Sequence, residues 1–490
     1  MTYINYRIVI KVIGLLIFIM GIFLMIPSLT AAFYEDIVLL PFVKSSALCL
    51  TAGVILYMIK VPVKDIRKRE GYLIVALGWI ILCLLGSMPY LFEEGLDVSL
   101  TDAIFESTSG LTTTGATIFD DIESINPAIL LWRSMTQWIG GMGIIVFTIA
   151  IFPILGIGGV ELFVAEAPGP TASKIHPQIK EVAKRLWYIY LGLTASLIVI
   201  LHYLSGLPAF DAINHALTTM STGGFSTKNA SIAHYNSAWV EYPIMLFMVL
   251  AGTNYTILYF LFKGKFQKLW SSDELKFYLL VLFMCILTGS MVLFGLDYYG
   301  LEESFRKAGF QVISLLTTTG YVTADYTSWT PGLELMFFFL LFTGACAGST
   351  SGGIKMIRHL VFFKTSLIEL KRILHPRGFM RLKIDGEVPQ SRITMHILVF
   401  LLFYLIIFAI GVLVISFSLP EIADPFKTAV GAVATSLGNV GPSIGSLGPV
   451  DNFADLNQMT KVILSLLMVI GRLELFTVII IFTPYFWRVK

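Results

Sequence analysis

Apolar runs long enough to cross a bilayer dominate this sequence. About 20 residues of helix span the hydrocarbon core, and ten runs are of that order: 8–26, 38–59, 72–92, 129–153, 186–205, 240–262, 275–296, 333–362, 394–418 and 459–487. A helix satisfies its own backbone hydrogen bonds in hydrocarbon, so each run is expected to be helical. Charged residues make up 13% of the chain, about half of the roughly 25% usual in soluble domains. The sequence therefore predicts an all-α polytopic membrane protein.

Basic residues are spread unevenly among the connecting segments. Lys and Arg gather in 60–69, 174–185, 263–276 and 355–392, which an alternating topology places on one side together with both termini. The positive-inside rule assigns that side to the cytoplasm. No small-residue cleavage site follows the first run, so we expect a retained span and not a signal peptide. The expected location is a cell inner membrane, crossed many times, with both termini cytoplasmic.

Nothing in the sequence points to an enzyme or to a bound cofactor. The four Cys show no C-x-x-C spacing and the seven His form no spaced set, so a metal or disulfide framework is not predicted. Arg472 and Glu474 are the ionisable residues that lie well inside an expected span, too few for a membrane-embedded active site. The net charge of +2 gives no reason to expect a nucleic-acid partner.

The segments expected outside the cell share one pattern. They are long, and each holds a short apolar run followed by a Gly-containing motif: 112–115 (TTTG), 220–224 (MSTGG), 317–321 (TTTGY) and 438–442 (GNVGP). Runs of about 10–14 apolar residues suggest re-entrant segments more than spans. Each run can form a short helix with an acidic start: Asp102, Asp211, Glu302 with Glu303, and Asp424. Taking Gly115, Gly223, Gly320 and Gly441 as equivalent gives a fourfold internal repeat of span, short helix, Gly loop and span.

Such loops have the chemistry of a cation filter. Non-helical backbone at membrane depth is tolerated where it lines a water-filled cavity, and carbonyl oxygens can then replace the hydration shell of a cation. Glycine permits the backbone angles that turn several carbonyls the same way. A single Thr-Gly motif is more often an ordinary turn, but four at matching places favour a filter. Its expected residues are Thr113, Thr114, Gly115, Ser221, Thr222, Gly223, Thr318, Thr319, Gly320, Asn439, Val440 and Gly441.

With these motifs the chain resembles, over its whole length, the Trk/Ktr/HKT superfamily of potassium transporters, and within it the TrkH type. The resemblance implies an N-terminal helix pair in 1–70 and pore repeats in 71–160, 180–265, 272–365 and 392–490. Intact Gly115 implies a preference for K⁺. The fourth motif departs from the family pattern because it lacks a Thr triplet, which leaves the register of that loop open.

The resemblance also implies partners. It suggests a homodimer and a cytosolic, nucleotide-binding, TrkA-like regulatory subunit, through which ATP, ADP or NAD would act. This chain itself carries no G-x-G-x-x-G fingerprint. Two alternatives to a K⁺ channel stay open, namely symport of K⁺ with H⁺ or Na⁺, and Na⁺ transport.

A gate is predicted below the filter. The run 344–353 (GACAGSTSGG) is a poor helix former and is expected to break the span 333–362. A basic residue inside a span costs roughly 2.5–3.5 kcal/mol on insertion scales, so Arg472 is expected to face the pore or a partner such as this run. The family resemblance implies a gate formed by Gly344, Gly348, Ser349, Gly352, Gly353, Lys355 and Arg472. A passive kink, and a structural arginine that binds buried carbonyls, are the alternatives. The small residues of 137–143 (QWIGGMG) are expected to serve close helix packing.

Overall fold

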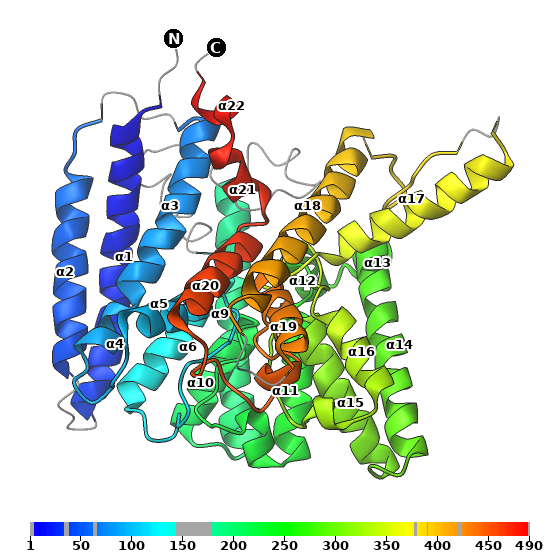
Figure 1. Ribbon diagram of the computed structural model, residues 1–490, viewed down its shortest axis with the longest axis horizontal. Coiled ribbons are helices and arrows are strands. Elements are labelled where there is room, and N and C mark those ends of the chain that lie inside the picture. Colours follow the sequence, from blue (N-terminus) through cyan, green and yellow to red (C-terminus); the bar gives the residue numbers. More distant parts are fainter. Residues whose placement is uncertain are drawn as a thin grey trace.

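The computed structural model describes residues 4–33, 39–61, 66–143, 179–376, 380–389, 391–419 and 424–488. These residues are largely helical (Figure 1), and β structure within them is confined to two isolated bridges. The predicted all-α fold is confirmed. The N-terminal helices are α1 (Tyr6–Phe33), α2 (Leu39–Tyr57), α3 (Lys68–Gly86) and α4 (Met88–Phe92). They are followed by α5 (Leu100–Leu111) and α6 (Pro127–Gly141).

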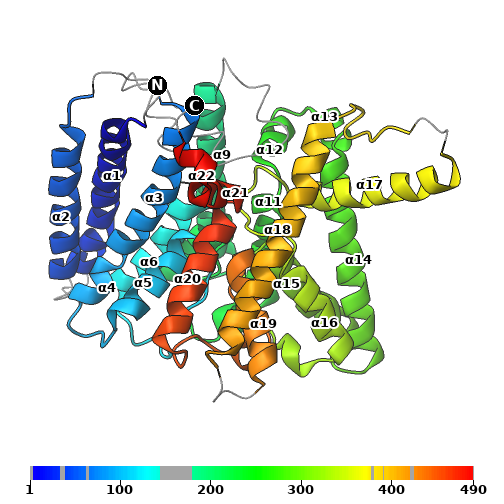
Figure 2. The same cartoon turned by 45° about the horizontal axis from the view of Figure 1, so that its top comes forward.

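The middle of the chain contributes α9 (Ile179–Val199), α10 (Ala209–Met220), α11 (Ala238–Ala251), α12 (Tyr255–Phe262), α13 (Phe266–Trp270), α14 (Asp273–Gly295), α15 (Leu301–Leu316) and α16 (Pro331–Leu340). The C-terminal part contributes α17 (Met356–Leu374), α18 (Ser391–Ser416), α19 (Pro425–Gly438), α20 (Gln458–Arg472), α21 (Phe476–Ile479) and α22 (Pro484–Trp487). Helix α17 extends sideways from the bundle (Figure 2).

Six helical stretches in the described residues are long and apolar enough to cross a bilayer, and two bent pairs raise that number to eight. The bent pairs correct the expectation of continuous spans at 240–262 and 459–487. α11 and α12 meet at 108°, and α20 meets the helical segment Phe476–Phe482 at 107°. Asn254 starts α12 as its N-cap, whereas Glu474 and Leu475 have positive φ and so cannot continue a helix.

The two remaining expected spans are shorter helices. The span 129–153 is helical over Pro127–Gly141, and its part beyond residue 143 lies outside the described residues. The span 333–362 is interrupted between α16 and α17, which confirms the predicted break at the Gly-rich run.

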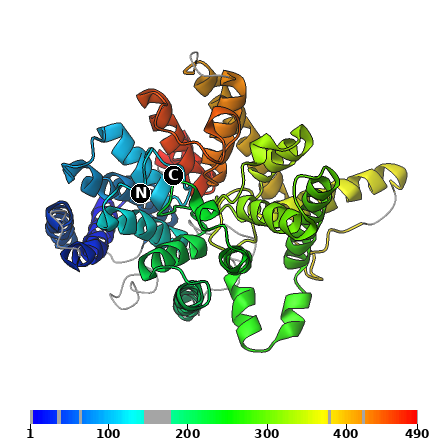
Figure 3. The same ribbon diagram turned by 90° about the horizontal axis from the view of Figure 1, so that it is seen from below.

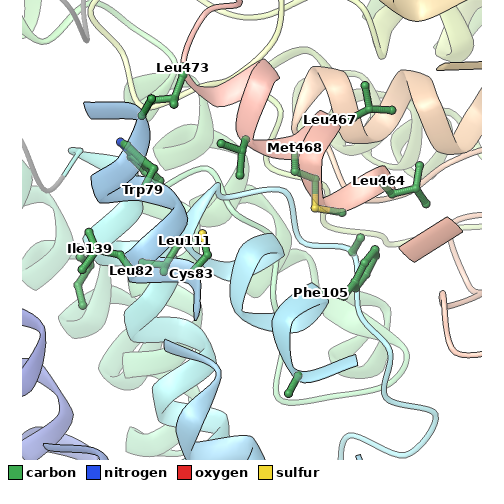
Figure 4. Packing of buried hydrophobic residues seen from close by; sticks show 14 of the residues in the cluster. Trp79, Leu82, Cys83, Phe105, Leu111, Ile139, Leu464, Leu467, Met468 and Leu473 are labelled. Carbon is green, nitrogen blue, oxygen red and sulfur yellow. The ribbon is translucent and has the colours of Figure 1, made fainter. Parts of the chain in front are cut away.

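The helices are arranged in chain order around the middle of the molecule. Viewed from below, the sequence colours pass from cyan through green and yellow to orange and red, and blue α1 and α2 lie outside this ring (Figure 3). The first and last parts of the chain therefore meet. Trp79 and Cys83 of α3, Leu111 of α5 and Met468 of α20 belong to one buried cluster there (Figure 4).

Candidate functional site

Four short helices, α5, α10, α15 and α19, end in the same way and carry the predicted loops. Beyond each end lies a left-handed residue with φ between 53° and 58°: Thr113, Thr222, Thr318 and Asn439. Its N–H donates to the carbonyl three residues back, and the next N–H donates to the carbonyl five residues back at 2.8–3.0 Å. This pair of bonds defines the Schellman motif of a helix C-terminus. The four loops therefore leave their helices with one shared geometry.

Threonine at the left-handed position is unusual. Glycine normally occupies it, and a β-branched residue at positive φ is a genuine outlier that costs on the order of 1–3 kcal/mol. Thr113, Thr222 and Thr318 adopt it nonetheless, and all three are completely buried. Strain of this kind persists where the surroundings fix the backbone, which is typical of functional sites.

The loops meet in a closed ring. A Cβ added to Gly115 would lie less than 3.0 Å from the carbonyl oxygen of Gly223. The same relation joins Gly224 to the Thr319 oxygen, Gly320 to the Val440 oxygen, and Gly441 back to the Thr114 oxygen. These four glycines have φ between 80° and 102°. Each loop thus packs one carbonyl oxygen against a glycine of another loop. A side chain in place of that glycine would clash with the oxygen.

The second loop corrects the predicted register by one residue. Gly224, and not Gly223, has the positive φ and the ring contact that match Gly115 and Gly320. Gly223 supplies the carbonyl of the ring instead. The sequence held the signal for this alignment, because an aromatic residue follows both Gly224 and Gly320.

Because the second loop is shifted by one residue, Ser221 is reassigned from the filter to the end of α10. Its hydroxyl donates to the carbonyls of Leu217 and Thr218 in its own helix, at 2.9 and 3.1 Å. Ser221 therefore belongs to the helix end, at the position that Thr112 and Thr317 take in the first and third loops. In the fourth loop, the φ of Asn439 and the ring contact of Gly441 match Val440 with Thr114, and this fixes the register that the sequence left open.

A buried ion pair braces the first two loops. Arg133 Nε donates to Glu106 Oε1 at 2.7 Å, and both side chains are at most 1% exposed. Glu106 also accepts a hydrogen bond from the N–H of Ile118 at 3.0 Å, and Arg133 donates to the carbonyl of Ser226 at 3.2 Å. The pair therefore ties the segment after Gly115 to the segment after Gly224. Arg133 lies within the expected span 129–153, so it corrects the expectation that only Arg472 and Glu474 are ionisable residues inside the expected spans.

The equivalent positions in the second and third loops also carry polar side chains that bond to the segment after the loop, whereas the fourth loop has Ala432 there. His215 and Gln311 lie seven residues before their left-handed threonines, as Glu106 does. His215 Nε2 bonds Ser226 Oγ at 3.0 Å, and Gln311 donates to the carbonyl of Ala324 at 3.1 Å. Sequence analysis missed this set, although polar residues at one fixed distance from three of the four motifs were a usable signal.

The Gly-rich run between α16 and α17 forms a compact loop. Its two ends lie side by side, because Gly344 donates to the carbonyl of Ile354 at 2.9 Å. Gly348 and Gly353 have positive φ, and the Ser349 hydroxyl donates to the carbonyl of Cys346 at 2.6 Å. The Gly-rich sequence that interrupts the helix therefore also brings the two ends of the loop together.

This loop contacts the left-handed residues of the second, third and fourth loops. Thr222 Oγ1 donates to Thr350 Oγ1 at 3.3 Å, and the N–H of Gly352 donates to Thr318 Oγ1 at 2.7 Å. A Cβ on Gly352 would lie less than 3.0 Å from the Cβ of Asn439. Of the predicted gate residues in this run, Gly352 therefore lies directly against the predicted filter, and Thr350, which was not predicted, does so too.

Arg472 connects the first filter loop to the Gly-rich run. Its guanidinium donates to Thr113 Oγ1 at 3.0 Å and to the Thr350 carbonyl at 2.9 Å. It also donates to the carbonyls of Gly140 and Gly141, at 2.5 and 3.0 Å. The predicted hydrogen bond between Arg472 and the Gly-rich run is confirmed. Gly140 and Gly141 pack against Leu111 and Ser221, where a Cβ on either would clash, so the predicted close packing of 137–143 is confirmed at these two positions.

Charged residues hold the end of the loop next to α17, and among them Lys355 was predicted from the sequence. Lys355 is 7% exposed and donates to the carbonyl and hydroxyl of Ser351. Arg358 pairs with Glu474. Glu274 of α14, which sequence analysis did not single out, accepts from the N–H groups of Ala347 at 2.6 Å and Ile357 at 3.1 Å.

The chemistry of the site is that of neutral oxygen ligands. Carbonyl and hydroxyl oxygens suit hard cations, whereas transition metals favour imidazole and thiolate. Across the described ranges no group of His, Cys, Asp and Glu is arranged to hold a metal ion. The fold and site define an all-helical, multi-span membrane protein in which loops from four parts of the chain bring backbone oxygens together.

Comparison with known proteins gives the family. The profile of the TrkH family, described as a cation transport protein, matches residues 41–488. The chain is 38% identical over 488 residues to "Trk system potassium uptake protein TrkH" of Salmonella typhimurium, covering 99% of this chain and 100% of that protein. It is 33% identical over 487 residues to "Trk system potassium uptake protein TrkG" of Escherichia coli K12, covering 98% and 99%.

A solved structure agrees over nearly the whole fold. The crystal structure of the potassium transporter TrkH from Vibrio parahaemolyticus superposes with a TM-score of 0.88 at 35% identity, covering 99% of this chain and 100% of that chain. The chain belongs to the TrkH family of cation transport proteins. It is a transport protein and not an enzyme, as its sequence predicted.

Proposed function

We propose that this chain conducts K⁺ selectively into the cell through a filter built from four loops of one polypeptide. The closed ring of glycines and carbonyl oxygens carries the proposal, because rings of carbonyls replace the hydration shell of a K⁺ ion. The four helix C-termini beside the ring place partial negative charge there, which favours a cation. The names of the relatives, potassium uptake proteins, support K⁺ as the transported ion.

The proposed architecture is an N-terminal helix pair followed by four pore repeats, with the boundaries expected from the sequence. The shared Schellman ends of α5, α10, α15 and α19 support the repeat. The start of α1 and the end of the chain at α22 lie on the same side of the bundle (Figure 1). Together with the basic bias of the connecting segments, this supports cytoplasmic termini in an inner membrane.

We propose that the Gly-rich run 344–353, here called the gate loop, forms the gate together with Lys355 and Arg472. They contact all four left-handed residues at the end of the filter next to α17, as described above, so a cation leaving the ring meets the loop. An arginine stays protonated at physiological pH, and in a low-dielectric pore its charge opposes a cation more strongly than in water. Loop and guanidinium therefore hold the path closed.

Control of this gate is proposed to come from outside the chain. A cytosolic nucleotide-binding subunit of the TrkA type would act on the basic segment 358–392, and two copies of this chain would form a homodimer. Helix α17 starts at Met356, directly after Lys355 of the gate, and extends sideways from the bundle (Figure 2). A partner that moves α17 would therefore move the loop.

The test of the filter is Gly115→Ser. A side chain at Gly115 would clash with the Gly223 oxygen and would have to adopt a φ of +87°. We expect the K⁺/Na⁺ flux ratio in liposomes to fall by about tenfold, which corresponds to about 1.4 kcal/mol. Gly192→Ser is the matched control, since a Cβ at Gly192 meets nothing within 4 Å. A folded Gly115→Ser protein with the wild-type ratio would remove this loop from the filter.

A further inference from the structure

The second filter loop lacks a side chain that the other three possess. The ring carbonyl comes from Thr114, Thr319 and Val440 in the first, third and fourth loops, all β-branched residues, but from Gly223 in the second. Gly224 follows directly, so two glycines adjoin one of the ring oxygens. Glycine has the largest backbone freedom of any residue. This loop therefore needs an external restraint to present its carbonyl as the others do.

Gln137 of α6 occupies the space of the missing side chain. A Cβ on Gly223 would lie less than 3.0 Å from the Cδ, Oε1 and Cβ atoms of Gln137. Gln137 Nε2 donates to the carbonyl of Gly223 at 2.6 Å, and the N–H of Phe225 donates to Gln137 Oε1 at 3.0 Å. One amide thus bonds the peptides on both sides of Gly224. Gln137 is completely buried, so water does not compete for these bonds.

Helix α6 holds Gln137 firmly. Arg472 binds the carbonyls of Gly140 and Gly141 at its C-terminal end, and those two glycines pack against Leu111 and Ser221 without room for a Cβ. Gln137 lies one helical turn earlier, on the side that faces the loop.

The first and third loops are restrained by their own residues. Thr114 Oγ1 bonds Thr112 Oγ1 at 2.8 Å, and Thr319 Oγ1 bonds Thr317 Oγ1 at 2.8 Å. Neither bond uses a ring carbonyl. In the second loop, by contrast, the restraint is a hydrogen bond to the ring oxygen itself.

We propose that Gln137 is a positioning residue that determines cation selectivity through the carbonyl of Gly223. Its amide keeps that carbonyl from rotating and occupies one of the two lone pairs, so the four ring oxygens are not equivalent ligands. Selectivity between K⁺ and Na⁺ depends on the number and field strength of the coordinating carbonyls. Loss of the amide frees the Gly223–Gly224 peptide to rotate and widens the range of cations accepted. This inference rests on the proposed filter.

The first experiment replaces the amide without changing its size. Gln137→Leu removes both hydrogen bonds, and so does Gln137→Met, whose side chain has the length of glutamine and no N–H or O–H donor. We expect both variants to lower the K⁺/Na⁺ flux ratio in liposomes about five- to tenfold, mainly through a higher Na⁺ flux. The methionine variant serves the same test where the leucine variant does not fold. Trp138→Phe is the control, because it removes a hydrogen bond from the other side of the same helix, to Thr194, and keeps the wild-type ratio.

A rescue experiment separates positioning from general packing. Gly223→Ala alone should clash with Gln137, including its Cβ, while Gln137→Gly alone, which removes that Cβ as well, should leave the loop free. In the double variant the alanine at 223 fills the vacated space and restricts the backbone, so its K⁺/Na⁺ ratio should exceed that of either single variant. A merely structural role of Gln137 predicts lower amounts of folded protein, an unchanged flux ratio per folded molecule and no rescue.

Gly115→Ser measured in the same liposomes distinguishes the two proposals. A wild-type ratio in folded Gln137→Leu or Gln137→Met protein, beside a lowered ratio in Gly115→Ser, would overturn the role of Gln137 alone. Wild-type ratios in all of these variants would overturn the filter as well.

Discussion

Arg472→Ala should open the pathway in the absence of any partner. Among its hydrogen bonds, the one to the carbonyl of Thr350 joins α20 to the gate loop, and that bond breaks when the loop moves. A hydrogen bond with one charged partner contributes roughly 1.5–3 kcal/mol. Its loss therefore shifts the equilibrium between closed and open by roughly 10- to 100-fold, since about 1.4 kcal/mol is a factor of ten.

The assay is the initial rate of rubidium tracer uptake into liposomes, normalised to folded protein. Arg472→Lys keeps the charge but loses the planar fork that reaches several carbonyls at once. Comparing its uptake rate with that of Arg472→Ala therefore separates the contribution of the hydrogen bonds from that of the electrostatic barrier. Arg306→Ala is the matched control, because Arg306 pairs with Glu241 and Glu302, away from the gate loop, and its loss should not raise uptake.

The structural alternative predicts the opposite sign. If Arg472 only satisfies buried carbonyls, its removal leaves those carbonyls unpaired at about 1–3 kcal/mol each and lowers both folding and flux. A well-folded Arg472→Ala protein with uptake at or below the wild-type rate would refute the gate.

Three further outcomes are expected. Deletion of residues 348–352 should raise rubidium uptake as Arg472→Ala does, and the two changes together should not add, because they remove one barrier; additive rates would mean two separate gates. Glu106→Gln leaves its buried arginine without a charged partner and should lower the free energy of unfolding by roughly 3–5 kcal/mol, seen as a lower thermal midpoint in detergent; an unchanged midpoint would show that the pair is dispensable. In intact cells a Cys introduced at Asp121 should react with an impermeant thiol reagent and a Cys at Lys68 should not, and the reverse pattern would invert the topology.

The helical membrane fold and the four loops were predictable because their signals are local. Apolar length and the Thr-Gly motifs depend on neighbouring residues alone. The register of the second loop was off by one because two adjacent glycines both permit positive φ, and the choice of Gly224 depends on its contact with the Thr319 oxygen of another loop. Phe225, which aligns with Tyr321, was a signal in the sequence for the correct register, but it was not used.

The broken helices and the braces were not predictable in the same way. Leu473 and Leu475 are apolar residues within an apolar run, yet Glu474 and Leu475 adopt positive φ there, so tertiary contacts override helix propensity. One of those contacts, Arg358 with Glu474, joins residues 116 positions apart. The pair of Glu106 with Arg133 likewise joins different helices, and hydropathy carries no information on which charges will meet.

The ring also sets an order of events during synthesis. Its last contact joins Gly441 to Thr114, and the Asn439 side chain bonds Thr114 across 325 positions of sequence. A ribosome therefore releases nearly the whole chain before the first loop meets its final neighbour, and closing so long a loop is slow. Until then the strained Thr113 lacks the arginine that binds it, because Arg472 is made later still. A chain truncated before α19 carries three loops without a closed ring, so an incomplete product cannot form the proposed filter.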